Sequence, residues 1–286
     1  YHKTFDNYRD TKKVLFDRLG KEAFAITNID DRNGLVMTQN SRARVLTYST
    51  HSMADFRGKI LEEGFDGMLL RVQSTLGAVN TEVFVPMVGR FNVSNLVLIY
   101  GAAVALGEDA MEVLRIMSGL QPVNGRFETI RSPKGWTAVI DYAHTPDAVE
   151  NVLKTINEIV AANTGNRTEP AQVITVVGCG GNRDKGKRPI MAKSAYQLST
   201  QLILTSDNPR DEEPMDILQD MAAGLTSEEL RQVLIIEDRE SAIKTACTLA
   251  RQGDVILVAG KGHEDYQIIK GVKHHFDDHE VVKECF

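Results

Sequence analysis

The second half of the chain alternates short apolar runs with stretches of helical spacing. The apolar runs are short and β-branched, as in buried strands, and the stretches between them repeat apolar positions every three to four residues. The predicted elements are strand 136–140, helix 146–160, strand 173–177, helix 187–197, strand 202–205, helix 214–225, strand 233–236, helix 239–250 and strand 255–258. This alternation is typical of an α/β protein and predicts a doubly wound parallel sheet.

The first half of the chain has a different pattern. Its middle part is rich in β-branched and aromatic residues that recur in short pieces broken by glycines, which favours antiparallel strands and hairpins. Stretches with helical spacing flank this part on both sides, and a glycine separates the last two of them. The predicted elements are a helix over 5–19, a strand over 23–29, a β-rich segment over 44–88, and helices over 95–106 and 108–120.

The sequence Q-P-V-N-G at residues 121–125 separates the two patterns. It consists of turn-forming residues, as expected for a connection between domains. We therefore predict two domains, residues 1–123 and residues 124–286. A length of 286 residues is sufficient for two such domains, each with a core of its own.

The composition excludes several classes of protein. With a formal net charge of −6, the chain has no basic footprint that would indicate a nucleic acid or an anionic membrane as its partner. The cysteines, Cys179, Cys247 and Cys285, lack C-x-x-C spacing, which argues against a disulfide framework and a zinc site. No run approaches the roughly 18 apolar residues of a membrane helix, and the first residues lack the apolar core of a secretory signal. We expect a cytoplasmic protein that acts on small molecules.

Four polar loops directly follow predicted strands. Because the carboxyl ends of parallel strands meet at one edge of a sheet, we expect these loops to form one polar cleft with charges of both signs. Their sequences are D-Y-A-H-T-P-D (141–147), G-C-G-G-N-R-D-K-G-K-R-P (178–189), S-D-N-P-R (206–210) and A-G-K-G-H-E (259–264). This cleft is the candidate site.

The glycine-rich loop at 178–189 allows a backbone to approach a ligand closely. Its cationic side chains offer hydrogen bonds to phosphate or carboxylate; they are Arg183, Lys185, Lys187 and Arg188. The loop contains neither G-x-G-x-x-G nor G-x-x-x-x-G-K-[ST], so it is a weak nucleotide fingerprint, and a nicotinamide dehydrogenase is disfavoured. A solvated basic turn that caps the next helix is the alternative interpretation.

The loop from Asp207 to Arg210 is the most specific of the four. Pro209 restricts Asn208 to extended conformations, so the loop is rigid and its guanidinium is suited to a planar anion. In the alternative interpretation, Asp207 and Asn208 form an Asx turn and cap the next helix. The G-K-G-H-E sequence is likewise either part of a site or a turn with an exposed Glu264.

Further candidates are ambiguous when each is taken singly. His144 lies where a helix N-terminus attracts phosphate, although single histidines are more often packing or surface residues. Arg126 in N-G-R-F-E has the same ambiguity. Lys12 lies on a predicted helix and is typical of a solvated lysine, whereas Asn92 and Asn95 are suited to cap the helix that starts there.

Taken together and in order, six motifs resemble those of the Mur ligases, in particular the branch that adds diaminopimelate to a peptidoglycan precursor. They are G-R-F-N-V-S-N, N-G-R-F-E, D-Y-A-H-T-P-D, G-C-G-G-N-R-D-K-G-K-R-P, D-N-P-R-x-E-x-P and G-K-G-H-E, and they span almost the whole chain. The resemblance implies that residues 124–286 are a Rossmann-like C-terminal domain that binds the incoming amino acid. Residues 1–123 would be the later, partly antiparallel part of a P-loop-type ATPase domain.

Some features of the family are not found in this sequence. The sequence lacks the G-T-x-G-K-[ST] phosphate loop, the UDP-binding domain, and the metal-ligating His that the family carries just ahead of the position of Tyr1. It also does not begin with Met. We therefore expect a chain that is truncated at its N-terminus.

The resemblance also implies roles for individual residues. Lys12 falls where these ligases carry a lysine carbamylated by CO2, and a carbamate is an anion able to ligate or orient Mg2+ beside phosphates. His144 is the other catalytic candidate. The implied ATP contacts are Asn92, Asn95, Arg126 and Asp141. The implied diaminopimelate contacts are Arg183, Asp207, Asn208, Arg210, Gly260 and Glu264.

The D-N-P-R form of the loop at 207–210 points to diaminopimelate as the amino acid. Diaminopimelate has an amino-acid head at each end, so after one amine reacts, the other end still offers a carboxylate to Arg210 and an ammonium to Glu264. Lysine lacks the distal carboxylate and would leave Arg210 unpaired, a loss of about 1 to 3 kcal/mol. The family's lysine-adding members are expected to lack this arginine.

The implied function is an ATP-dependent amide ligase of peptidoglycan synthesis. ATP would phosphorylate the D-Glu side-chain carboxylate of UDP-MurNAc-L-Ala-D-Glu, and the diaminopimelate amine would then attack the acyl phosphate, with ATP and Mg2+ as the implied cofactors. We expect a monomer in the bacterial cytoplasm, without a nucleic acid or membrane partner, and no ligation by this chain alone. Two alternatives stay open: a folylpolyglutamate synthetase-like ligase, and a non-catalytic amino-acid-binding module.

Overall fold

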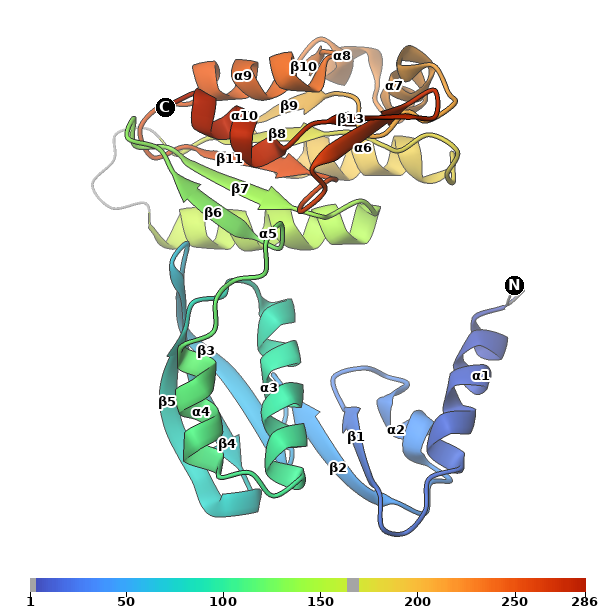
Figure 1. Cartoon of the computed structure of the whole chain (residues 1–286), viewed down its shortest axis with the longest axis vertical. Helices are drawn as coiled ribbons and strands as arrows, with labels where there is room; N and C mark the ends of the chain where they lie inside the picture. The colour runs from blue at the N-terminus through green and yellow to red at the C-terminus, as the bar shows by residue number, and fades with distance from the viewer. Residues whose placement is uncertain (1–3, 164–169) are drawn as a thin grey trace. The chain divides into compact units, whose positions relative to one another are not determined.

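The computed structural model describes residues 4–163 and 170–286 and divides into two compact units (Figure 1). Unit 1 is Tyr1–Gln121 and unit 2 is Pro122–Phe286. The division falls within the Q-P-V-N-G connection, where the sequence changes its pattern. No helix in the described ranges is both long enough and apolar enough to cross a membrane.

Unit 1 contains one five-stranded sheet in the order β1-β2-β3-β4-β5. Its strands are β1 (Phe24–Asn28), β2 (Arg44–Ser49), β3 (Phe56–Gly64), β4 (Gly67–Ser74) and β5 (Val79–Val85). The β3-β4-β5 part is antiparallel, as the sequence predicted for this segment. The β2–β3 pair is parallel, contrary to that prediction. The chain leaves the sheet after β2 and re-enters it at β3 in the same direction. Just ahead of β3, the Asp55 carboxylate accepts hydrogen bonds from the Thr47 amide and hydroxyl of β2.

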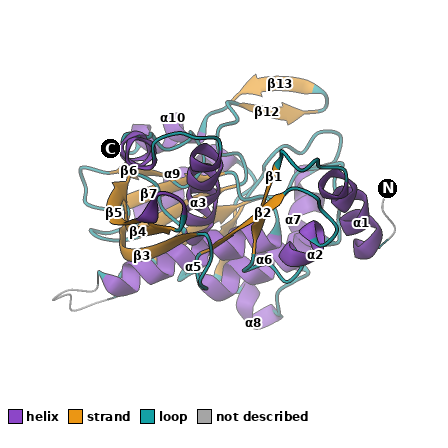
Figure 2. Cartoon of the chain, turned by 90° about the horizontal axis from the view of Figure 1, so that it is seen from below, coloured by secondary structure: helices purple, strands orange, loops and turns teal. Residues whose placement is uncertain are grey.

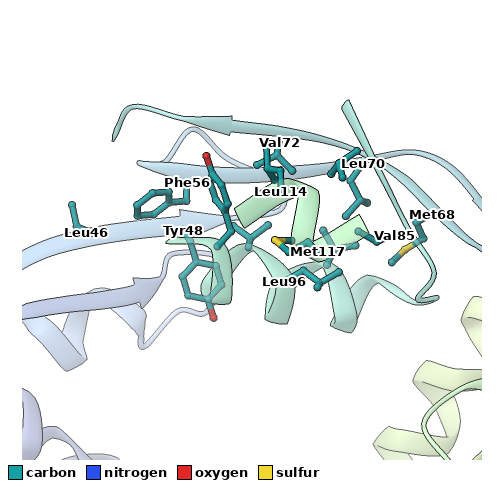
Figure 3. Close-up of a cluster of buried hydrophobic side chains, with 14 residues drawn as sticks. Leu46, Tyr48, Phe56, Met68, Leu70, Val72, Val85, Leu96, Leu114 and Met117 are labelled. Carbon is teal, nitrogen blue, oxygen red and sulfur yellow. The ribbon is translucent and has the colours of Figure 1, made fainter. Parts of the chain in front are cut away.

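Helices complete unit 1, and two of them form its core with the sheet. The helical elements are α1 (Phe5–Asp17), α2 (Gly34–Thr38), the 3-10 turn η1 (Leu76–Ala78), α3 (Arg90–Ala105) and α4 (Ala110–Ser118). Side chains of α3 and α4 pack on the strands in one apolar cluster (Figure 3). Phe56 lies edge-on to Tyr100 at 6.0 Å between ring centroids, and a Cβ on Gly101 would lie 2.7 Å from the Phe56 ring. The glycine thus allows α3 to lie directly against β3.

Unit 2 contains a six-stranded sheet in the order β10-β9-β8-β11-β7-β6. Its strands are β6 (Glu128–Arg131), β7 (Thr137–Asp141), β8 (Val173–Val177), β9 (Gln201–Leu204), β10 (Val233–Ile235) and β11 (Val255–Ala259). All neighbouring pairs are parallel except β6–β7, which is antiparallel. Every residue of β8 and β11 is buried, as expected for central strands covered on both faces. The prediction of a doubly wound Rossmann-like sheet is confirmed.

Helices cover both faces of this sheet. Figure 1 shows α5 and α6 on one side and α9 and α10 on the other. The helices of the unit are α5 (Pro146–Ala162), α6 (Lys187–Leu198), α7 (Pro214–Ala222), α8 (Ser227–Leu230), α9 (Arg239–Leu249) and α10 (Asp278–Glu284). The α5 helix begins where the sequence predicted, because the Thr145 hydroxyl accepts a hydrogen bond from the Ala148 amide and Pro146 takes the first helical position.

A separate two-stranded hairpin follows the last strand of the main sheet. It consists of β12 (Tyr266–Ile269) and β13 (Val272–His275), which pair antiparallel. Figure 2 shows this hairpin as a pair of strands set apart from the main sheet. The hairpin is not among the predicted elements, although it lies directly after the G-K-G-H-E loop.

Candidate functional site

The four polar loops of unit 2 meet at the carboxyl ends of β7, β8, β9 and β11, where they enclose a cleft of about 310 Å3. The position is the one expected for a ligand in a doubly wound sheet. Of the predicted site residues, the cleft is lined by His144, Arg183, Asp207, Asn208, Arg210, Gly260 and Glu264. Tyr142, Thr145, Gly180, Asp184 and Lys187 also line it.

Glycines of the 178–189 loop are needed because this loop packs backbone against backbone on the 206–210 loop. A Cβ on Gly178 would lie 2.4 Å from the Thr205 carbonyl oxygen, and one on Gly181 would lie 1.9 Å from that of Pro209. The Gly181 amide also donates to the Asn208 carbonyl at 2.8 Å. These glycines therefore serve packing between two cleft loops.

Two of the four cationic side chains of the glycine-rich loop form ion pairs within the protein. Arg188 is fully buried and forms a bidentate pair with Glu212 at 2.8 and 2.9 Å, plus a bond to Asp220 at 2.8 Å. Lys185 lies 3.2 Å from the same Glu212. Hydrogen bonds lower the pKa of Glu212 to about 2, and those from Arg188 have the largest effect. Arg183 is exposed and has no hydrogen bond or ion pair with the described residues, so it is available to an anion in the cleft.

Asn208 links the two acidic groups of the cleft. Its Nδ2 donates to Asp207 Oδ1 at 3.1 Å and to Glu264 Oε2 at 2.8 Å. Its Oδ1 accepts from the Ile268 amide of β12 at 2.8 Å, which fixes the orientation of the amide group. The N-cap position of the next helix, α7, is Glu213, so neither Asp207 nor Asn208 caps that helix. The Asx-turn interpretation of this loop is therefore wrong.

Arg210 is held at the edge of the cleft by its backbone and its side chain. Its φ is +54°, a conformation that costs a non-glycine residue roughly 1–2 kcal/mol. The Arg210 amide donates to the Ile268 carbonyl at 2.9 Å, and its carbonyl accepts from the Lys270 amide at 2.6 Å. The Nη1 atom donates to the carbonyls of Gly181 at 3.0 Å and Asn208 at 3.3 Å. The guanidinium is thus preorganised before any ligand binds.

The acidic side of the cleft is partly compensated by Lys261, which the sequence analysis did not single out. The Lys261 ammonium is fully buried, donates to the Tyr266 carbonyl and lies 3.6 Å from Glu264 Oε2. Burial raises the pKa of Asp207, and the positive charges of Arg239 and Lys261 oppose this rise. Burial lowers the pKa of Lys261. The cleft thus has an acidic side around Asp207 and Glu264 and a basic side with Arg183 and Arg210.

An aromatic group borders the cleft beside the first loop. The ring centroids of His144 and Tyr142 lie 4.7 Å apart, and His144 Nδ1 is 2.8 Å from the Tyr142 carbonyl oxygen. The ring centroid of His263 lies 5.2 Å from that of Tyr142, and the Arg126 guanidinium carbon lies 4.9 Å from the same centroid. Neither Tyr142 nor His263 is among the predicted site residues, although they lie inside the D-Y-A-H-T-P-D and G-K-G-H-E motifs. The group offers a flat surface with a cation at its side.

The Asp141 carboxylate binds two backbone amides in this structure. Its Oδ2 accepts from the Phe127 amide and its Oδ1 from the Ala143 amide, both at 2.7 Å. Burial raises the pKa of this carboxyl. Asp141 does not line the cleft, so its predicted role in binding ATP stays a prediction.

The remaining predicted residues lie in unit 1. Lys12 is exposed on α1, with its Nζ 4.8 Å from the Tyr8 ring centroid. On α3, Asn92 donates to the Val88 carbonyl at 2.7 Å, and Asn95 is exposed. Gly89 is the N-cap of α3, so the capping interpretation of the two asparagines is wrong. Their predicted contacts with ATP stay predictions.

Unit 1 also has a cleft of its own, of about 350 Å3, which contains none of the predicted site residues. Its lining includes the cationic side chains Arg57, Lys59 and Arg90 and no acidic residue. Within residues 4–163 and 170–286, no group of three or more His, Cys, Asp or Glu side chains is arranged to hold a metal ion.

The fold and the cleft of unit 2 define a Rossmann-like domain suited to a small molecule that carries charges of both signs. Two family models match the chain: the Mur ligase middle domain over residues 1–104 and the Mur ligase glutamate ligase domain over residues 125–262. The chain belongs to the Mur ligase family.

Curated relatives are similar over the whole chain. It is 59% identical to the UDP-N-acetylmuramoyl-L-alanyl-D-glutamate--2,6-diaminopimelate ligase of Phocaeicola vulgatus, covering 100% of this chain and 56% of the relative. The ligase of the same name from Bacteroides thetaiotaomicron is 57% identical, with 100% of this chain and 57% of the relative covered. The chain thus spans a little over half the length of these relatives.

Solved structures agree with the fold. One of a UDP-N-acetylmuramoyl-L-alanyl-D-glutamate--2,6-diaminopimelate ligase matches with a TM-score of 0.64 and 37% identity, covering 100% of this chain and 57% of that one. The MurF ligase from Thermotoga maritima in complex with ADP matches with a TM-score of 0.66, covering 100% of this chain and 58% of that one. At 18% identity, this second likeness concerns the fold alone.

Proposed function

We propose that the whole protein is an ATP-dependent ligase that joins diaminopimelate to UDP-MurNAc-L-Ala-D-Glu, and that the cleft of unit 2 binds the diaminopimelate. The names of the similar ligases support this substrate pair. One observation carries the proposal: the same cleft is lined by an arginine that the protein holds in place, Arg210, and by a carboxylate, Glu264.

The two sides of the cleft are complementary to the unreacted end of diaminopimelate. Its carboxylate binds the guanidinium groups of Arg210 and Arg183, and its ammonium binds Glu264 beside Asp207. Lysine has the ammonium group but no distal carboxylate, so it leaves the guanidinium of Arg210 without an anionic partner. The cleft therefore selects diaminopimelate by its second carboxylate.

The proposed reaction has two steps. ATP first transfers its terminal phosphoryl group to the D-Glu side-chain carboxylate, and the diaminopimelate amine then displaces the phosphate, forming an amide and losing a proton. Unit 2 contributes by holding the amine close to the acyl phosphate, which converts a bimolecular step into one within a complex. The proposed ATP contacts are Asn92, Asn95, Arg126 and Asp141, and His144 is the proposed catalytic residue.

Magnesium is proposed to accompany ATP, and it would neutralise phosphate charge when bound. A carbamate on Lys12 would supply one anionic ligand or orienting group. Since the described residues form no cluster of metal ligands, no step is assigned to the ion. A monomeric enzyme of the bacterial cytoplasm remains part of this proposal.

Calorimetry with this chain tests the binding part of the proposal. Diaminopimelate is expected to bind at least about tenfold more tightly than lysine, which corresponds to about 1.4 kcal/mol for the second carboxylate. Lys154→Ala, a substitution outside the cleft, should keep this preference, because Lys154 is exposed on α5, where it pairs with Glu150. Equal affinity for the two amino acids would contradict the proposal.

Turnover by the whole protein tests the reaction. Release of phosphate from ATP should require both UDP-MurNAc-L-Ala-D-Glu and diaminopimelate. A protein that instead uses a folate and glutamate would be a folylpolyglutamate synthetase-like ligase, a class to which this chain is similar in fold. A protein that binds diaminopimelate but releases no phosphate with both substrates present would be a binding module.

A further inference from the structure

A buried ion pair lies behind the cleft. Arg239 is the first residue of α9 and Asp278 the first of α10, and both side chains are fully buried. The guanidinium binds the carboxylate in a bidentate manner, with Nε–Oδ1 and Nη2–Oδ2 both 2.8 Å. Neither residue lines the cleft. The two helices are thereby fixed to each other at their first residues.

The same guanidinium also binds the ends of two strands. Its Nη2 donates to the Ala259 carbonyl at 3.1 Å, and its Nη1 to the Ser206 carbonyl at 3.3 Å. Ala259 directly precedes Gly260, and Ser206 directly precedes Asp207. Arg239 therefore contacts the first residue of each of two cleft loops, 206–210 and 259–264.

These two loops do not leave neighbouring strands. Ala259 ends β11 and Ser206 follows β9, and β8 lies between these strands in the sheet. No hydrogen bond between β9 and β11 can therefore set the spacing of the two loops where they leave the sheet, and only farther along are the loops joined, by the Asn208–Glu264 hydrogen bond. The guanidinium spans this gap, because it binds one carbonyl beyond β9 and one at the end of β11.

We infer that Arg239, held in place by Asp278, is a positioning residue that sets the spacing between the 206–210 loop and the 259–264 loop. The acidic and basic groups that meet a doubly charged amino acid come from both loops, so their separation determines how well the ligand fits. The part of this inference that concerns diaminopimelate rests on the proposed function.

Only arginine can make this set of bonds. It has five N–H donors in a planar fork, and four of the bonds are present here: two to the carboxylate and two to carbonyls. A lysine has three donors on one atom, so it cannot reach both carbonyls and both carboxylate oxygens. Burial raises the pKa of Asp207, and the positive charge of Arg239 is the largest influence that opposes this rise.

The variants Arg239→Lys and Asp278→Asn test the inference with this chain. Lys244→Ala is the control, because Lys244 also joins α9 to α10, through Glu284 at 3.0 Å, but does so at the surface. Thermal unfolding comes first, and all later measurements are made at a temperature where every variant is folded. Asp278→Asn keeps the size of the side chain and so provides a second variant if Arg239→Lys does not fold.

Amide hydrogen exchange measures the loops without any ligand. The Gly260 amide, bonded to the Asp141 carbonyl, and the Arg210 amide, bonded to that of Ile268, should exchange at least about tenfold faster in both variants. The Tyr142 amide in the first loop is the internal reference and should keep its rate. Unchanged exchange at Gly260 and Arg210 in folded variants would overturn the inference, whatever ligand the cleft binds.

Calorimetry with diaminopimelate gives the second readout. We expect about tenfold weaker binding in both variants and unchanged binding in Lys244→Ala. The magnitude is taken from metal sites, where loss of a residue that orients a ligand has an effect of this order. A variant that unfolds at lower temperature but binds diaminopimelate as tightly as the unaltered chain would show a purely structural role and refute the inference. If the unaltered chain itself binds no diaminopimelate, the proposed function fails, and the exchange rates still decide the role of Arg239.

Discussion

Replacing Arg210 by alanine and by glycine separates the affinity of the cleft from the stability of unit 2. Both substitutions remove the guanidinium that is proposed to bind the distal carboxylate of diaminopimelate. They differ in their effect on the backbone, because residue 210 has φ of +54°. Glycine adopts this conformation without strain, whereas alanine keeps the strain that arginine has.

The expected magnitudes follow from the bonds that are lost. A hydrogen bond between charged groups contributes about 1.5–3 kcal/mol, so either substitution should weaken diaminopimelate binding by about 10- to 150-fold. The bonds of Nη1 to the carbonyls of Gly181 and Asn208 contribute about 1 kcal/mol each to stability. Arg210→Ala should therefore lower the free energy of unfolding by about 1–2 kcal/mol. In Arg210→Gly, relief of about 1–2 kcal/mol of strain offsets most of that loss.

Calorimetry with diaminopimelate and with lysine, together with denaturant unfolding, measures these effects. Lysine affinity should stay nearly constant in both variants, so that the ratio between the two amino acids falls toward one. An unchanged ratio in both variants would refute the assignment of Arg210 to the distal carboxylate. A glycine variant less stable than the alanine variant would refute the argument about backbone strain.

Three further predictions concern residues around the cleft and in unit 1. A Cβ on Gly180 would lie 2.7 Å from Arg210 Nη1, so Gly180→Ala should weaken diaminopimelate binding by about 1 kcal/mol in calorimetry. A Cβ on Gly181 would lie 1.9 Å from the Pro209 carbonyl oxygen, so Gly181→Ala should instead lower the free energy of unfolding by about 1–3 kcal/mol. The pKa of Glu212 is about 2 in the folded chain against an ordinary 4.5, so its contribution to stability is complete above pH 4.5 and is lost as the pH falls toward 2. Glu212→Gln should therefore flatten the curve of unfolding free energy against pH in this range. Phe56→Ala should destabilise unit 1 by about 3–5 kcal/mol in denaturant unfolding, because the ring is fully buried.

The sheet of unit 2 could be predicted from the sequence because its strands are buried on both faces. β8 was predicted over the residues that it occupies, since an apolar run between helical stretches has few other interpretations. β6 was missed because it is a four-residue edge strand, half-buried to exposed, without a continuous apolar run. The β12–β13 hairpin was missed for a similar reason, and because its turn places Lys270 at a φ of +46°, where glycine or asparagine is expected.

The site could be predicted as far as topology determines it. Loops that leave parallel strands meet at one edge of the sheet, so loops distant in sequence could be assigned to one cleft. The buried charges could not be assigned, because an arginine or lysine is usually solvated and its burial depends on partners distant in sequence. Arg188 was predicted to offer its charge to a ligand, but it binds Glu212 and Asp220 instead. Arg239 and Lys261 were not considered at all.

The packing of Gly125 restricts which residue can stand at this position. Gly125 is the last residue of the connection between the units, and its carbonyl accepts a hydrogen bond from the Tyr142 amide. A Cβ on it would lie 2.1 Å from the His263 nitrogen, so it fits tightly against the last cleft loop. Gly125 itself is buried, whereas residues 121–124 ahead of it are exposed. Any residue with a side chain at position 125 would therefore displace the loop that carries Glu264.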